Sequence, residues 1–78
     1  MSGHSSIVEM FLVLDDLMVP VAQLGDRFLL LDQPFEHPPA DGEMILRIDA
    51  LQHEWRVRLP QGISPDSPRV DAVRISGA

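Results

Sequence analysis

The chain has 78 residues, of which 45% are apolar and 23% charged, a composition typical of one small folded domain and not of a disordered segment. Twelve acidic residues against six arginines give a formal charge of −6, which disfavours binding to nucleic acid. Because there is no cysteine, disulfides and thiolate metal sites are excluded.

The lack of cysteine and of a basic N-terminal region favours a cytoplasmic protein. The apolar run at residues 7–14 is far shorter than the roughly 20 residues that cross a bilayer, so we expect no membrane contact. We expect a flexible N-terminal tail at residues 1–6, a single β domain at 7–75 and a C-terminal tail at 76–78.

The first element, Ile7–Leu14, is apolar at every position except Glu9. It fits either a buried strand or the start of a short helix, and the Asp15-Asp16 pair that follows favours a strand. A small two-layer domain can rarely cover both faces of such a strand. Either the chain's own loops and C-terminal segment cover it, or a second protein does. In the second case its interface residues are Val8, Met10, Leu12 and Leu14.

Two shorter strands follow. Met18–Leu24 contains Pro20, and a proline inside a strand pattern favours an edge strand or a bulge. Phe28–Asp32 is an apolar run between turn signals, and it predicts a further strand that ends at Pro34.

The clearest pattern is the alternation of apolar and polar residues from Glu43 to Leu59, which predicts a β-hairpin. A loop centred on Leu51-Gln52 pairs the apolar residues on one face, as Ile48–Trp55, Leu46–Val57 and Met44–Leu59. On the other face this register puts Arg47 opposite Arg56 and Asp49 opposite Glu54. Like charges directly across a ladder are unfavourable, so neighbouring strands or a partner must supply opposite charges.

The last segment, Arg69–Ile75, is β-rich, but its alternation slips between Val70 and Val73. It predicts a bulged final strand or an extended segment that docks on the sheet. Together the elements predict an all-β domain, a small antiparallel meander or half-open barrel of about five or six short strands. Its expected core residues are Trp55, Ile48, Leu46, Val57, Phe28 and Leu30.

No catalytic, cofactor or metal motif is present. His4, His37 and His53 lack metal-ligand spacing, and the glycines do not form a phosphate-binding loop. The leading hypothesis is a non-catalytic module for self-association, most simply a homodimer, or for docking on another protein. The alternatives are a small-ligand-binding β-barrel and an enzyme whose site is assembled between subunits from His37, His53, Asp41 or Glu54. We expect Arg47, Arg56 and Arg58 on the outer face, where they can contact an anion or a partner.

Overall fold

The structure is a computed structural model that describes residues 7–76, and these residues form one antiparallel sheet. In chain order its strands are β1 (Val8–Leu14), β2 (Leu17–Leu24), β3 (Phe28–Leu31), β4 (Ala40–Ile48), β5 (Leu51–Leu59), β6 (Arg69–Asp71) and β7 (Val73–Ser76). The predicted tails at 1–6 and 76–78 lie outside the described residues, except for Ser76, which ends β7. Within residues 7–76, no helix is long and apolar enough to cross a membrane.

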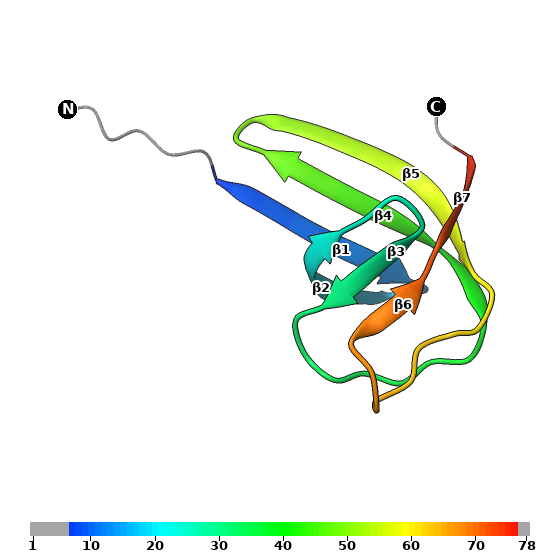
Figure 1. Ribbon diagram of the computed structural model, residues 1–78. Coiled ribbons are helices and arrows are strands. Elements are labelled where there is room, and N and C mark those ends of the chain that lie inside the picture. Colours follow the sequence, from blue (N-terminus) through cyan, green and yellow to red (C-terminus); the bar gives the residue numbers. More distant parts are fainter. Residues whose placement is uncertain (1–6, 77–78) are drawn as a thin grey trace.

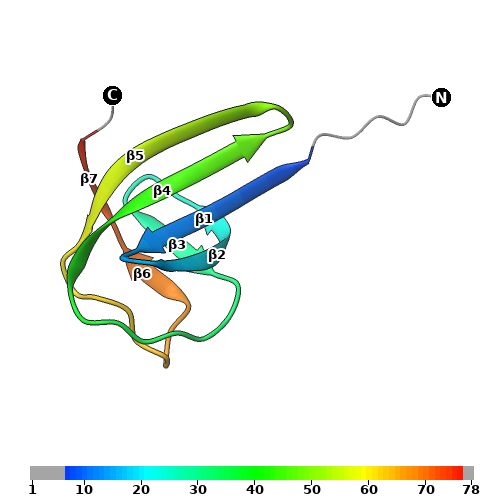
Figure 2. The same cartoon turned by 180° about the vertical axis from the view of Figure 1, so that it is seen from behind.

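The sheet curls into a nearly closed barrel because its two outer strands are consecutive in the chain. The strand order is β6-β3-β2-β1-β4-β5-β7, so β6 and β7 lie at opposite edges, although only Ala72 separates them (Figures 1 and 2). Ala72 is buried, and its amide donates a hydrogen bond to the carbonyl of Arg27 at 3.0 Å. The predicted all-β, half-open barrel is confirmed. The slip in alternation at the end of the sequence is the point where the chain crosses between the two edges.

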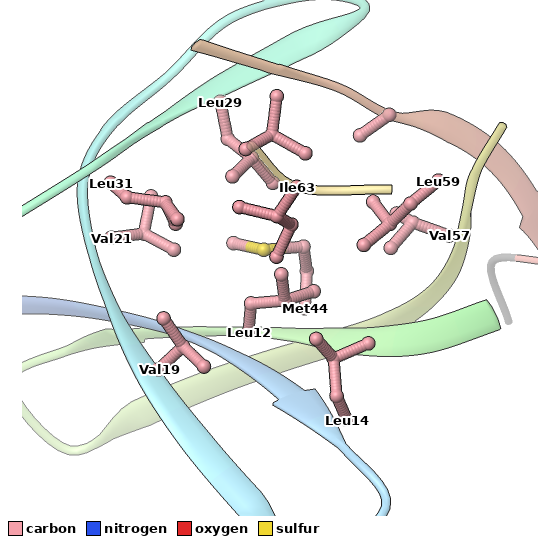
Figure 3. Packing of buried hydrophobic residues seen from close by; sticks show 12 residues of the cluster. Leu12, Leu14, Val19, Val21, Leu29, Leu31, Met44, Val57, Leu59 and Ile63 are labelled. Atoms are coloured by element: carbon pink, nitrogen blue, oxygen red, sulfur yellow. The ribbon is translucent and has the colours of Figure 1, made fainter. Parts of the chain in front are cut away.

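Apolar side chains fill the barrel (Figure 3). Ile63, from the loop between β5 and β6, is buried among them, and two backbone hydrogen bonds with His37, at 3.0 and 2.7 Å, hold this loop in place. No polar side chain of the described residues is buried. The twelve buried apolar residues are Leu12, Leu14, Val19, Val21, Leu29, Leu31, Met44, Val57, Leu59, Ile63, Val70 and Ala72.

The predicted core is only partly right. Of the six residues expected there, Val57 is buried and the other five are half-buried, namely Trp55, Ile48, Leu46, Phe28 and Leu30. In β3 the predicted inward face is wrong, because Leu29 and Leu31 are buried and Phe28 and Leu30 are not. Every residue of this strand is apolar, so alternation carries no information about which side faces inward.

The predicted β4–β5 hairpin is confirmed, but its predicted register is wrong by four residues. The turn is Asp49-Ala50, and Ile48 pairs with Leu51 where Trp55 was expected. A shift by an even number keeps every side chain on its predicted face. It also removes the expected clash of like charges, because Asp41 now lies opposite Arg58, Glu43 opposite Arg56, and Arg47 opposite Gln52.

Asp49 makes this tight turn possible. Its φ of 55° lies in the left-handed region, which aspartate tolerates better than most residues. Its carboxylate accepts a hydrogen bond from the Ile7 amide at 3.1 Å, and its own amide donates to the Ile7 carbonyl at 3.0 Å. The turn is therefore tied to the beginning of β1.

The prediction that residues 18–24 form an edge strand is wrong, because β2 lies between β1 and β3. Pro20 is tolerated there because of its position. Its carbonyl accepts a hydrogen bond from the Asp32 amide at 3.4 Å, so its edge without an N–H faces the residue that follows the end of β3. The missing N–H therefore removes only a bond beyond the end of β3, and the β1–β2 ladder is unaffected.

The buried and exposed leucines of the β1–β2 hairpin provide a test of the core. Leu12 is fully buried, whereas Leu17 is 47% exposed. We expect Leu12→Ala to lower the free energy of unfolding by about 3 kcal/mol and Leu17→Ala by less than about 1 kcal/mol. Urea unfolding followed by circular dichroism measures both values. Equal losses for the two variants contradict the position of β1 in the barrel.

Candidate interaction surface

Three strands continue beyond the barrel as a ribbon (Figures 1 and 2). β2 pairs with β1 only along Phe11–Leu14, and β7 pairs with β5 only along Arg56–Arg58. The remaining parts of β1 and β5 are joined only to β4. We call residues 8–10, 45–48 and 51–55 the projecting ribbon.

One face of the projecting ribbon continues the barrel's inner wall. The strand registers place Leu12, Met44 and Trp55 in one cross-strand row at the barrel. The next two rows, on the same face, are Met10–Leu46–His53 and Val8–Ile48–Leu51. Val8 is 53% and Leu51 66% exposed, while the apolar residues between them are half-buried. We call the residues of these two rows, together with Trp55, the inner face.

The predicted interface on β1 is divided by the end of the barrel. Leu12 and Leu14 are buried in the core, so their inclusion in an interface is corrected. Val8 and Met10 lie on the inner face and keep accessible apolar surface. β1 is therefore apolar on this side for two reasons, since one half forms the core and the other half extends past it.

The projecting ribbon also has an open backbone edge along β5. The Asp49 amide donates to the carbonyl of Ile7, just before β1, so odd-numbered residues of β4 direct their amides toward β1. The even-numbered residues of β4 therefore direct theirs toward β5, where Ile48 pairs with Leu51. The odd-numbered residues of β5 complete this ladder. Gln52 and Glu54 consequently direct their backbone groups away from β4, and no described strand pairs with them there.

Sequence reasoning missed this edge because it placed Leu51 and Gln52 in the loop. A signal for the true register was present in the charges. Only the observed pairing puts Asp41 opposite Arg58 and Glu43 opposite Arg56.

The three arginines of the predicted anion or partner contact lie on the outer face of β4 and β5. Arg47 bonds to Glu9 at 3.3 Å and to Gln52, and Arg58 bonds to Asp41 at 2.9 Å. Arg56 lies across from an acid, Glu43. A partner's carboxylate or phosphate must compete with these acids at Arg47 and Arg58. The hydrogen bond from Arg58 lowers the pKa of the Asp41 carboxyl from its ordinary value of 3.8.

A smaller group of apolar side chains lies on the outer face. Phe11 and Val13 of β1 are half-buried there, next to Ile45 on β4, and Met18 on β2 is 57% exposed. We call these four residues the outer apolar patch. It has no open backbone edge beside it, since β1 is paired on both sides at Phe11 and Val13.

A pocket of about 340 Å³ opens where the projecting ribbon leaves the barrel. Its lining includes the apolar side chains of Met44 and Val57 and the aromatic side chains of Phe28 and Trp55. The Arg74 guanidinium lies 5.2 Å from the ring centre of Trp55, within cation–π distance. Asp26 adds a single acidic group to the lining.

The residues considered for an intersubunit active site are not brought together within one chain. His53 is on the inner face and Glu54 on the outer face of β5, while Asp41 is bonded to Arg58. His37 lies in the loop before β4, where its Nδ1 is 2.7 Å from the carbonyl of Pro38. Residues 7–76 contain no group of three histidine or acidic side chains arranged to hold a metal, and His4 lies outside them.

Comparisons with protein-family models, with curated proteins and with solved structures find no match to this chain. The inference about function therefore rests on the molecule's own geometry.

The Asp41–Arg58 pair has a pH signature. Because its pKa is lowered in the folded state, Asp41 stabilises the fold above about pH 4, and this contribution is lost as the pH falls through its folded-state pKa. We expect Arg58→Gln to shift the Asp41 titration to higher pH in a carboxyl NMR experiment. Arg47→Gln, at the far end of the hairpin, should leave it unchanged. Identical Asp41 titrations in the wild type and Arg58→Gln contradict the assignment.

Proposed function

We propose that this protein is a non-catalytic interaction module that self-associates through the inner face of its projecting ribbon. The observation that carries this proposal is the continuation of the core-facing pattern for two rows past the end of the barrel. Val8 and Leu51, in the outermost row, are both more than half exposed. Such contiguous apolar surface is typical of a binding site, whereas single exposed apolar residues are ordinary.

The filled barrel supports the same conclusion. Met44 and Leu12 occupy its interior at 0% exposure, so the central space is used for stability. Ile7, Leu17, Val73 and Ile75 are also exposed apolar residues, but the inner face and the outer apolar patch are the two groups that span neighbouring strands of the projecting ribbon and the barrel. Of these two groups, only the inner face adjoins an open strand edge, which adds backbone hydrogen bonds to apolar contact.

Polar substitutions at the exposed end of the inner face test this proposal. We expect the double variant Val8→Ser with Leu51→Ser to be monomeric at concentrations where the wild type is a dimer, because both changes remove apolar area from the interface. Its melting temperature should stay close to that of the monomeric wild type, since both residues lie outside the core. Light scattering over a dilution series measures the mass.

The matched control is Met18→Ser in the outer apolar patch, which has comparable exposure. It should leave the dimer intact. A wild type that is monomeric at all concentrations contradicts self-association. Loss of the dimer in Met18→Ser alone assigns the interface to the outer apolar patch.

A second candidate function is small-ligand binding, and the pocket beside Trp55 favours it. Its volume lies at the lower end of the range for ligand sites, and its lining combines aliphatic and aromatic side chains with one cation, Arg74. This lining suits a small aromatic or aliphatic carboxylate.

The single tryptophan provides the readout for this alternative. If the pocket binds such carboxylates, a panel of them should change the fluorescence of Trp55 and raise the melting temperature. Arg74→Gln should weaken both effects. A panel that produces neither effect eliminates this candidate without bearing on self-association.

A further inference from the structure

We propose that two copies of this chain join through the open edges of β5, running antiparallel about a two-fold axis at His53. The two projecting ribbons then form one continuous sheet. This inference rests on the proposed function and deepens it, because it names the edge, the register and the partner. Of the inner face, it places Leu51, His53 and Trp55 at the joint, whereas Val8 lies two strands away on β1.

The open edge is long enough for such pairing. It runs over Leu51–Trp55 and stops at Arg56, whose backbone is already paired with Ser76 of β7. Along it, Gln52 and Glu54 direct their N–H and C=O groups outward. A strand edge with which no described strand pairs is a template for another strand. The outermost strands β6 and β7 offer edges of only three and four residues.

Symmetry leaves few registers. In a two-fold antiparallel pair, one residue lies opposite its own copy, and bonded positions must face bonded positions. If the two-fold axis passed through Glu54, Gln52 would have to pair with Arg56 of the second copy, whose backbone is already paired with β7. If the axis passed through Gln52, Glu54 would have to pair with Ala50 of the second copy, which lies in the turn and not in a strand. A centre at His53 uses the whole edge, with two pairs of Gln52 and Glu54 that each exchange two backbone hydrogen bonds.

The side chains fit this register. On the inner face Leu51 lies opposite Trp55 of the second copy, which is a favourable aliphatic–aromatic pair. On the outer face Gln52 lies opposite Glu54 of the second copy, so an amide donor meets a carboxylate. Gln52 already contacts Glu54 within its own chain and accepts from Arg47 at 3.1 Å. The second copy's carboxylate thus joins an existing polar network.

The other open edge of the projecting ribbon lacks this complementarity. On β1 it covers Val8–Met10, and a symmetric pair centred on that stretch sets Glu9 against Glu9 of the second copy. Like charges directly opposite weaken a ladder. The residues on β5 therefore favour self-pairing, and those on β1 disfavour it.

The register makes the dimer sensitive to acid, because it places two His53 rings opposite each other. The neighbours of His53 in its row are Leu46 on β4 and Met10 on β1, both uncharged. Arg74 of β7, stacked on Trp55, is a cation on the same side. Glu54 lies on the opposite face of the strand. Protonation of both rings therefore puts two positive charges together without a facing acid.

Disulfide trapping tests the register, since the chain has no cysteine of its own. In this register residue 53 of one copy lies directly opposite residue 53 of the other, close enough for a disulfide. His53→Cys should therefore form covalent dimers under mild oxidation. The matched control is Leu51→Cys, on the same face and edge. Its two copies are about 13 Å apart along the strand and should remain mostly unlinked.

A second pair of variants separates backbone pairing from side-chain contact. Gln52→Pro removes an outward N–H without touching the β4–β5 ladder, and it should weaken the dimer about tenfold or more. Gln52→Ala keeps the N–H and should weaken the dimer far less. The wild-type dimer should also weaken on acidification, and His53→Gln should abolish this dependence.

The outcomes distinguish this inference from the proposed function. A dimer that is lost in Val8→Ser with Leu51→Ser, but not trapped by His53→Cys, overturns the β5 register and keeps the interaction module. Efficient trapping by Leu51→Cys overturns it as well.

Discussion

The turn at Asp49 is the constraint on which the other features of the molecule depend. A two-residue turn at this position sets the register of β4 and β5, and the register decides which residues share a row. It brings Asp41 to Arg58 and Glu43 to Arg56, and it places Leu51 at the start of a strand. The two hydrogen bonds between Asp49 and Ile7 pass the same alignment on to β1. A turn two residues further along would remove both the ion pairs and the open edge.

Closure of the barrel depends on the link at Ala72. Because β6 and β7 are joined by this single residue yet pair with opposite edges of the sheet, the chain holds the two edges together itself. β2 leaves β1 at Pro20, where it turns to pair with β3. The barrel thus ends at Phe11 on β1 and at Arg56 on β5, where pairing with β2 and β7 stops. The projecting ribbon is the part of β1, β4 and β5 that continues past these residues.

The sequence predicted the class of fold and the faces of its best-patterned strands, because period-two alternation depends only on which side is buried. It was wrong about the register of β4 and β5, because two registers that differ by four residues bury the same side chains. The charges were the discriminating signal, because the observed register sets Asp41 against Arg58 and Glu43 against Arg56. In β3, and in β1 apart from Glu9, a run of apolar residues left the inward face undefined.

The candidate surface was predicted only in part, for a related reason. Val8, Met10, Leu12 and Leu14 form one uninterrupted pattern, and nothing in it marks where the barrel stops. That boundary depends on how far β2 and β7 extend, because β2 covers only part of β1 and β7 covers only part of β5. These are non-local facts that a linear pattern does not contain.

The net charge adds a condition that the proposed assembly satisfies. Two copies with a formal charge of −6 each repel one another, so they associate best where acids are sparse. The inner face has no acidic residue in its rows, and the β5 edge contributes only Glu54. Arg47 lies one strand away from the edge, on the side to which Glu54 of the second copy would come. In contrast, the outer apolar patch adjoins Glu9 and Glu43, and self-contact there would bring these acids together. Both the apolar and the electrostatic arguments therefore select the same surface.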